Sequence, residues 1–290
     1  MNRVQVAFVL YGDRYSEAYI DCLAASILEH TQLQIDFVCL SDRPDRRFEH
    51  DIRIVVHPEM DLDWDILMDG CRFKLGLFHA GVLNPDVLTF FFDLDTMVMG
   101  DIQRLADIHA RNPGLYVLPF HMIQTWKILP FVKWLRPSHF FYGTSSFMMF
   151  MPRDFTFIYQ AFRTLYDRVI AGETLAGQEA KAWRTDELLV CWAADGKTRG
   201  VSLSVFGRFR RCFAVPYSAT LARLRSRLGL NVYDKPSLIG MTFDGGPFKP
   251  WLLAECKDGD LLQERKHYVA WRFPKYAAYW RKVIAQSKQP

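Results

Sequence analysis

Two aspartates separated by one leucine follow a short apolar run near residue 90. Residues 88–92 are Leu-Thr-Phe-Phe-Phe, typical of a buried strand, and Asp93 and Asp95 come directly after them. Because side chains alternate along a strand, both carboxylates are expected on one side, about 6.6 Å apart at the backbone, with Leu94 directed into the core. Carboxylates so placed suit Mg²⁺ or Mn²⁺, which bind carboxylate and phosphate oxygens. The alternative is a strand end whose aspartates only cap the next segment.

The elements that must position these aspartates alternate between strands and helices. We expect strands at residues 4–10, 33–40, 52–56 and 87–92, and helices at 16–30 and 72–82. This alternation predicts right-handed βαβ units and an α/β fold, a single Rossmann-like domain with a mostly parallel central sheet flanked by helices. Open sheets of this kind bind ligands outside the carboxyl ends of their strands, where Asp93 and Asp95 fall.

The second half of the chain is less regular. Residues 119–142 form an aromatic and basic insertion with three prolines, on the expected acceptor side, and a strand resumes at 144–151. Helices are expected at 155–171 and 179–194, and a hairpin at 201–215. We divide the chain into one domain at 1–255 and a basic, aromatic helical tail at 256–290.

Charge is distributed unevenly along the chain. Half of the 290 residues are apolar, enough for a sizeable core, so disorder is not expected. Residues 196–233 and 265–290 hold 15 of the 36 Lys and Arg and no Asp or Glu. Such a basic part indicates a phosphorylated substrate or an anionic membrane surface, or it is a solvated face. Four residues of the tail recur at helical spacing and would either contact a lipid headgroup layer or dock on the core: Tyr276, Tyr279, Trp280 and Val283.

The cysteines and the N-terminus bear on the compartment. The six cysteines contain no Cys-x-x-Cys pair, which indicates a reducing compartment. The N-terminal apolar run is too short for a signal peptide, and nowhere do about 18 apolar residues run together. We therefore expect a cytoplasmic protein, with peripheral contact to the inner face of a membrane through 265–290 as an open possibility.

Several segments occur in an order that resembles a known family. Tyr11-Gly12-Asp13 with Tyr15 near the N-terminus is followed by a basic helix, by Phe-Phe-Asp-Leu-Asp-Thr, and by Gly-x-x-Lys-Pro-Trp at residues 246–251. The series resembles the GT-A nucleotide-sugar glycosyltransferases of family 8, the group of glycogenin and bacterial lipopolysaccharide hexosyltransferases, over roughly residues 3–253. The resemblance implies a GT-A fold and a metal-dependent transfer of a hexose from a nucleoside diphosphate sugar, UDP-sugar first, to a glycan or glycolipid hydroxyl in polysaccharide biosynthesis. It also implies retention of the anomeric configuration, and no nucleic-acid partner.

The resemblance assigns donor-binding roles. Leu10, Tyr11 and Tyr15 match the turn that holds the nucleotide base, and Tyr15 is suited to stack on uracil. Arg72 and Lys74 fall where the family places a cation on the phosphates, unless they are surface charges. In the last motif, Lys249 would contact the departing β-phosphate. The full expected donor set is Leu10, Tyr11, Tyr15, Arg72, Lys74, Asp93, Leu94, Asp95, Thr144, Ser145, Gly246 and Lys249.

Two further segments match the sugar side of the family's site. Thr144 and Ser145 stand where the family shows Asn-Ser-Gly beside the donor sugar, and the alternative is that they only break the strand. Asp186 and Glu187 resemble the family's Asp-Gln pair beside the anomeric carbon. A carboxylate there stabilises an oxocarbenium-like centre or receives the acceptor's proton. The alternative is an acidic helix N-terminus favoured by the helix dipole.

One departure from the family affects the metal. The family places a metal-binding histidine three residues before the glycine of the last motif, and this chain has Phe243 there. Asp244 is the nearest replacement, so we expect Mn²⁺ or Mg²⁺ on Asp93, Asp95 and Asp244. Trp251, at the end of the same motif, is expected to be a core anchor.

Two other functions remain open. Haloacid-dehalogenase-like phosphatases also show Asp-x-Asp-x-Thr after an apolar strand, with the first aspartate (here Asp93) as nucleophile and the second (here Asp95) as general acid. Against this, their motif lies in the first strand, and no Asp-Asp pair follows here. The loss of the histidine at Phe243 also permits a sugar-nucleotide binding module with weak or no catalysis.

Overall fold

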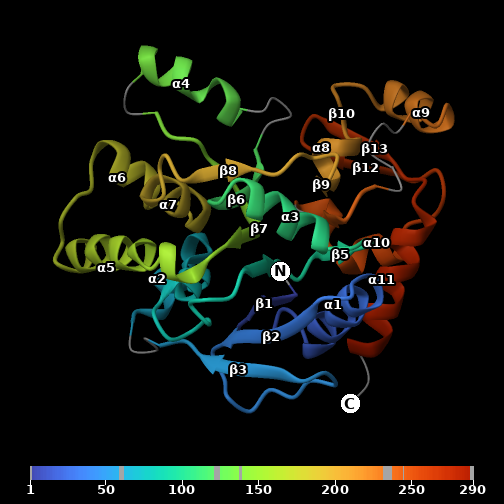
Figure 1. Cartoon of the computed structure of the whole chain (residues 1–290). Coiled ribbons are helices and arrows are strands. Elements are labelled where there is room, and N and C mark those ends of the chain that lie inside the picture. Colours follow the sequence, from blue (N-terminus) through green and yellow to red (C-terminus); the bar gives the residue numbers. More distant parts are fainter. Residues whose placement is uncertain are drawn as a thin grey trace.

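The structure is a computed structural model that describes residues 2–58, 62–120, 125–136, 139–230, 237–243 and 245–287. Within these residues, a seven-stranded sheet has the order β3-β2-β1-β4-β7-β6-β8 (Figure 1). Its strands are β3 (Ile52–Val56), β2 (Gln34–Ser41), β1 (Arg3–Leu10), β4 (Thr89–Phe92), β7 (Gly143–Phe150), β6 (Leu115–Pro119) and β8 (Thr198–Gly200). Only β7 runs against its neighbours. The predicted α/β fold with a mostly parallel sheet is confirmed.

The two faces of the sheet are covered by different helices. Successive residues of β1 alternate between them, so that Val6 and Phe8 join one core cluster and Ala7 and Val9 the other. The first face is packed by α1 (Glu17–His30), α3 (Gln103–Arg111), α10 (Pro250–Glu255) and α11 (Pro274–Ser287). The second is packed by α2 (Trp64–Met68), the 3₁₀ helix η1 (Asp69–Phe78), α5 (Phe157–Ile170) and α7 (Asp186–Ala193).

Two small sheets extend the fold beyond the central sheet. One has the order β5-β11-β9, with β5 (Thr96–Val98), β11 (Gly240–Thr242) and β9 (Phe206–Arg208). The other has the order β10-β13-β12, with β10 (Val215–Pro216), β13 (His267–Ala270) and β12 (Leu261–Glu264). Thr96 of β5 pairs with Thr242 of β11. This pairing brings the chain after residue 240 to the segment that carries the aspartates.

Two sequence predictions about the second half are wrong in detail. The helix expected at 179–194 is divided into α6 (Gly177–Ala182) and α7, because the side chain of Thr185 accepts a hydrogen bond from the backbone N–H of Leu188 and begins a new helix. The hairpin expected at 201–215 is instead β9, α8 (Phe209–Phe213) and β10, whose strands belong to different sheets. The remaining helices are α4 (Thr125–Leu135), η2 (Pro152–Asp154), α9 (Ala219–Arg227) and η3 (Gly246–Phe248).

The described part of the C-terminal segment packs into the main core. Tyr276, Trp280 and Val283 of α11 are buried in the same cluster as α1 and β1, and α11 lies beside α1 and α10 (Figure 1). The lipid-facing placement considered for these side chains is therefore wrong, and residues 256–287 do not form a separate tail. Among the described residues, the helices are all too short or too polar to cross a membrane.

The burial of α11 predicts a large stability cost when its aromatic anchor is removed. Trp280 is almost fully buried, so Trp280→Ala should lower the free energy of unfolding by about 3–5 kcal/mol through lost contacts and a cavity. The matched control is Arg281→Ala, an exposed neighbour on the same helix, which should change it by less than about 0.5 kcal/mol. Urea unfolding followed by circular dichroism measures both. Equal, small effects would show that α11 is not part of the core.

Candidate active site

The two aspartates lie in the turn between β4 and β5. The strand ends at Phe92, so the strand alternation expected for Asp93 and Asp95 does not orient them. Backbone hydrogen bonds hold the turn instead: the N–H of Asp93 donates to the carbonyl of Ser146 at 2.9 Å, and the N–H of Phe243 donates to the carbonyl of Asp95 at 2.8 Å. Segments from β7 and from the chain after β11 therefore fix the two carboxylates.

Each aspartate is paired with a lysine from another part of the chain. Lys74 Nζ lies 2.7 Å from a carboxylate oxygen of Asp93, and Lys249 Nζ lies 2.7 Å from one of Asp95. Lys74 also lies 3.9 Å from Asp186. Burial opposes a charged ammonium, but Asp93 and Asp186 hold the pKa of Lys74 well above its usual value. Lys74 therefore stays charged between the carboxyl groups of Asp93 and Asp186.

The two lysine–aspartate pairs line one cavity of about 140 Å³. Eight residues of the expected donor set line it: Leu10, Tyr11, Tyr15, Lys74, Asp93, Leu94, Asp95 and Lys249. Sequence reasoning did not select three other lining residues, Val9, Arg14 and Cys71. Arg14 had a usable signal, because it lies in the turn between Tyr11 and Tyr15. Cys71 had none, since it reaches the cavity only through a local backbone kink.

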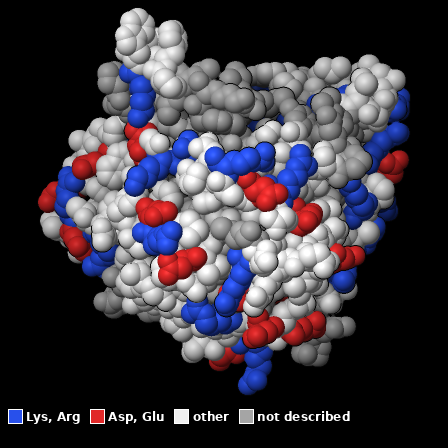
Figure 2. Space-filling view, in the orientation of Figure 1, with Lys and Arg blue, Asp and Glu red and all other residues white. Residues whose placement is uncertain are grey.

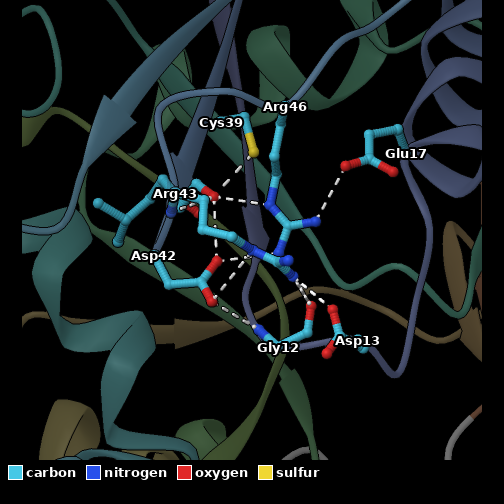
Figure 3. Close-up of polar contacts among 9 residues, drawn as sticks. Gly12, Asp13, Glu17, Cys39, Asp42, Arg43 and Arg46 are labelled. Atoms are coloured by element: carbon cyan, nitrogen blue, oxygen red, sulfur yellow. Dashed lines mark hydrogen bonds and ion pairs between the residues drawn. The ribbon is translucent and has the colours of Figure 1, made fainter.

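A charged network fastens the turn that carries Tyr11 and Tyr15 (Figure 3). The buried guanidinium of Arg46 donates to Glu17, to Asp42 and to the carbonyl of Gly12, with donor–acceptor distances of 2.9 to 3.0 Å. The N–H of Gly12 donates to Asp42 at 3.0 Å, and Gly12 adopts φ +59°, which favours glycine. The loop after β2 therefore sets the conformation of the β1–α1 turn.

Two rings and a guanidinium lie together at the cavity: Tyr15 and Arg14 line it, and Trp251 packs beside them without lining it. The rings of Tyr15 and Trp251 have centroids 6.1 Å apart, and the guanidinium of Arg14 lies 5.7 Å from the first ring and 5.8 Å from the second. Trp251 is 37% exposed, so its expected role as a plain core anchor is wrong. The group offers flat apolar faces and one exposed cation to an incoming ligand.

A kink in η1 brings Lys74 to the aspartates. Gly70 and Cys71 both have φ +59°, and a Cβ at Gly70 would meet the carbonyl oxygen of Arg184 at 2.7 Å. Glycine therefore lets η1 approach the segment before α7, which places Lys74 and Cys71 beside Asp186. Burial raises the pKa of the Cys71 thiol.

Arg72 does not belong to the cavity, contrary to the sequence prediction. Its side chain is 2% exposed and points away into the fold, where it donates to the carbonyls of Ile66, Asp69 and Trp183. Its guanidinium also stacks on the Trp183 ring at 4.3 Å. Arg72 holds the start of η1 against the end of α6, and of the expected pair only Lys74 lines the cavity.

The expected sugar-side residues lie behind Lys74. Asp186 begins α7, and its carboxylate accepts a hydrogen bond of 2.5 Å from Ser145 Oγ. Burial raises the pKa of Asp186. The charge of Lys74 and the hydrogen bond from Ser145 offset part of this rise. Burial and the charge of Asp186 raise the pKa of Glu187 to about 7, and a hydrogen bond from Thr144 works against this rise. None of these four residues lines the described cavity directly, but Asp186 is joined to it through Lys74.

The residues that could hold a metal are the two aspartates of the turn. Phe243, at the position of the expected histidine, is fully buried against Phe209, Tyr276 and Trp280. Asp244 lies outside the described residues, and within those residues no group of three His, Cys, Asp or Glu side chains could hold an ion. Two carboxylates facing a cavity still fit Mg²⁺ or Mn²⁺, because these ions take their other ligands from water and substrate phosphates. Gly246 begins η3, which leads to Lys249, and does not line the cavity.

Comparison with solved structures relates the whole described fold to known proteins. An active-site mutant of LgtC superposes with a TM-score of 0.59 at 14% identity, over 99% of this chain and 97% of that one. The chain has the fold of LgtC. The galactosyltransferase LgtC in complex with donor and acceptor sugar analogues gives 0.57 at 12% identity over the same shares, and the bifunctional glycosyltransferase WbbM gives 0.55 at 12% over 99% of this chain and 50% of that one. No family model and no curated protein sequence matches the chain.

The raised pKa of Glu187 predicts a loss of stability with rising pH. Between the ordinary value of 4.5 and about 7, the folded protein binds more protons at this carboxyl than the unfolded chain does, so the free energy of unfolding falls as the pH rises through that window. Glu187→Gln removes the titration. The natural protein should therefore lose on the order of 2 kcal/mol of unfolding free energy between about pH 5 and about pH 8, compared with the Glu187→Gln variant over the same range.

Urea unfolding at several pH values tests this expectation. Asp107→Asn, a change at an exposed site on α3, is the control and should leave the pH profile unaltered. Parallel profiles for Glu187→Gln and the natural protein would mean that Glu187 has an ordinary pKa.

Proposed function

We propose that the protein is a glycosyltransferase that moves a hexose from a nucleoside diphosphate sugar to a hydroxyl of a glycan or glycolipid. A UDP-sugar is the leading candidate for the donor. The observation that carries the proposal is the meeting of Asp93, Asp95, Lys74 and Lys249 with Tyr11 and Tyr15 in one cavity. The LgtC-like fold supports it. Retention of the anomeric configuration is proposed from the family resemblance of the sequence.

The paired charges suit the diphosphate of such a donor. Phosphate oxygens compete with Asp93 and Asp95 for the ammonium groups of Lys74 and Lys249, and charge-assisted hydrogen bonds to phosphate are among the stronger contacts in proteins. Asp93 and Asp95 are then available to Mn²⁺ or Mg²⁺, which would neutralise charge on the departing nucleotide. Lys249 contributes the same stabilisation from the protein, without any covalent step.

The base and the sugar would occupy opposite ends of the cavity. Tyr15, Trp251 and Arg14 offer stacking surfaces for the base. The cavity of about 140 Å³ is smaller than the roughly 300–1,000 Å³ of typical ligand sites, so binding of a whole donor would require side chains at its edge to move. Asp186, which contacts the cavity only through Lys74, would lie toward the sugar, and Glu187, with a pKa of about 7, would accept the proton of the attacking hydroxyl.

The other two functions have less support. The aspartates follow β4 rather than the first strand, which does not favour the phosphatase. A sugar-nucleotide binding module shares every feature of the cavity and differs only in turnover. Measuring both binding and transfer therefore separates the candidates.

The proposal predicts a metal-dependent response to one class of ligand. In a thermal-shift screen, a UDP-sugar with Mn²⁺ should raise the melting temperature, and chelation of the metal should abolish most of the rise. Lys249→Met and Asp95→Asn should each weaken UDP binding about 10- to 100-fold by calorimetry, because each removes a charge-assisted contact. Asp107→Asn is the matched surface control and should bind normally.

Three outcomes would contradict parts of the proposal. Absence of any nucleotide-sugar response would reject the donor, and an unchanged response after chelation would reject the metal. Tight UDP binding without release of UDP from any UDP-sugar would favour the binding module. Hydrolysis of phosphate monoesters that is lost in Asp93→Asn would favour the phosphatase.

A further inference from the structure

Helix α9 exposes a row of leucines. Leu221, Leu224 and Leu228 are 51%, 49% and 60% exposed, and their spacing places them on one face of the helix. Ala222 and Ser226, on a different face, are buried against the body. The leucines are thus not required for docking α9, and their exposure costs solubility without a packing benefit.

Arginines border the leucine row. Arg223 and Arg227 are exposed on the outer side of α9, whereas Arg225 is used internally and donates to the carbonyls of Cys212 and Leu230. Residues 196–233 contain no Asp or Glu, so no acid of this stretch offsets the arginines. The outer side of α9 is therefore both apolar and positively charged.

Helix α4 repeats this combination. Phe131, Trp134 and Leu135 are 64%, 76% and 61% exposed, and Arg136 is exposed beside them. Lys133 pairs with Asp195 at 2.5 Å. Aromatic side chains next to cations are typical of segments that lie in the headgroup layer of a membrane.

The two helices lie along the same edge of the molecule. In Figure 1, α4 and α9 both stand at the upper edge, outside the layers that pack on the central sheet. The space-filling view in Figure 2 shows white protrusions with blue side chains next to them at both upper corners. The two helices therefore form one edge of the molecule in this view, apart from the layers that pack on the central sheet.

We propose that this edge is a binding surface for an anionic lipid bilayer, with Phe131, Trp134, Leu135, Leu221, Leu224 and Leu228 entering the headgroup layer. The charges favour a bilayer over other partners, because the arginines of α9 are complementary to anionic headgroups. The apolar side chains would gain free energy by burial among the lipids. The surface differs from the one considered from the sequence, because the aromatics of α11 are already buried. A lipid surface also fits an acceptor that is itself attached to lipid.

Vesicle flotation with the full chain tests the proposal. The protein should float with vesicles of phosphatidylcholine and phosphatidylglycerol and remain below vesicles of phosphatidylcholine alone. Added salt should weaken the association, since screening reduces the attraction between exposed charges. Equal recovery with both vesicle types, or none with either, overturns the proposal.

Paired variants locate the surface. Arg223→Gln with Arg227→Gln should weaken binding to the anionic vesicles about 30-fold, because two cations near the surface are lost. Leu221→Ser with Leu224→Ser should weaken it at least about tenfold through lost apolar burial. Circular dichroism and melting temperature should be unchanged for both, since the altered side chains are exposed.

Matched controls separate this edge from the C-terminal segment. Arg281→Gln with Lys282→Gln removes the same charge from α11, and Leu28→Ser changes an exposed leucine of α1; both should bind vesicles normally. Loss of binding in the α11 variant, but not in the α9 variants, overturns the proposal. Sedimentation velocity without lipid tests self-association. A dimer that is lost in the Leu221→Ser, Leu224→Ser variant would show that the leucines contact a second copy of the chain, and would overturn the membrane proposal.

Discussion

Two carboxylate–ammonium pairs connect segments that are 19 and 154 residues apart in the chain, and the candidate site depends on them. Asp93 with Lys74 and Asp95 with Lys249 place four charged groups around one small cavity. A buried charge without a partner is costly, so each side chain constrains the position of the other. In the proposed function, the two phosphates of the donor would replace the carboxylates as partners of both lysines.

The backbone around the aspartates is fixed by the core rather than by the charges. Phe243 donates its N–H to the carbonyl of Asp95 while its ring packs among Phe209, Tyr276 and Trp280. A side chain that lies at a possible ligand position is thus committed to packing. The C-terminal helix α11 supports the site through this cluster, which links the last described helix to the turn after β4.

Apolar side chains outside the site also divide into two groups, one buried in the core and one exposed at the surface. The aromatics of α11 are needed inside, where they complete the core over α1 and β1. The apolar side chains of α4 and α9 have no such place, and they occur together with cations at one edge. Both groups have similar composition in the sequence, and only their position in the fold distinguishes an anchor from an exposed surface.

The sequence by itself determined the parallel half of the sheet and most of the residues that line the cavity. The strands and the helix of the first 60 residues follow from local periodicity, which needs no knowledge of the rest of the chain, and Asp93, Asp95 and Lys249 stand in short motifs. Sequence reasoning placed Lys74 correctly but not Arg72, because the kink at Gly70 and Cys71 sends these two side chains in opposite directions. The sequence also did not reveal which lysine pairs with which aspartate, or that the aromatic face of α11 is buried in the core. Those depend on contacts between residues distant in the chain, which only the tertiary structure decides.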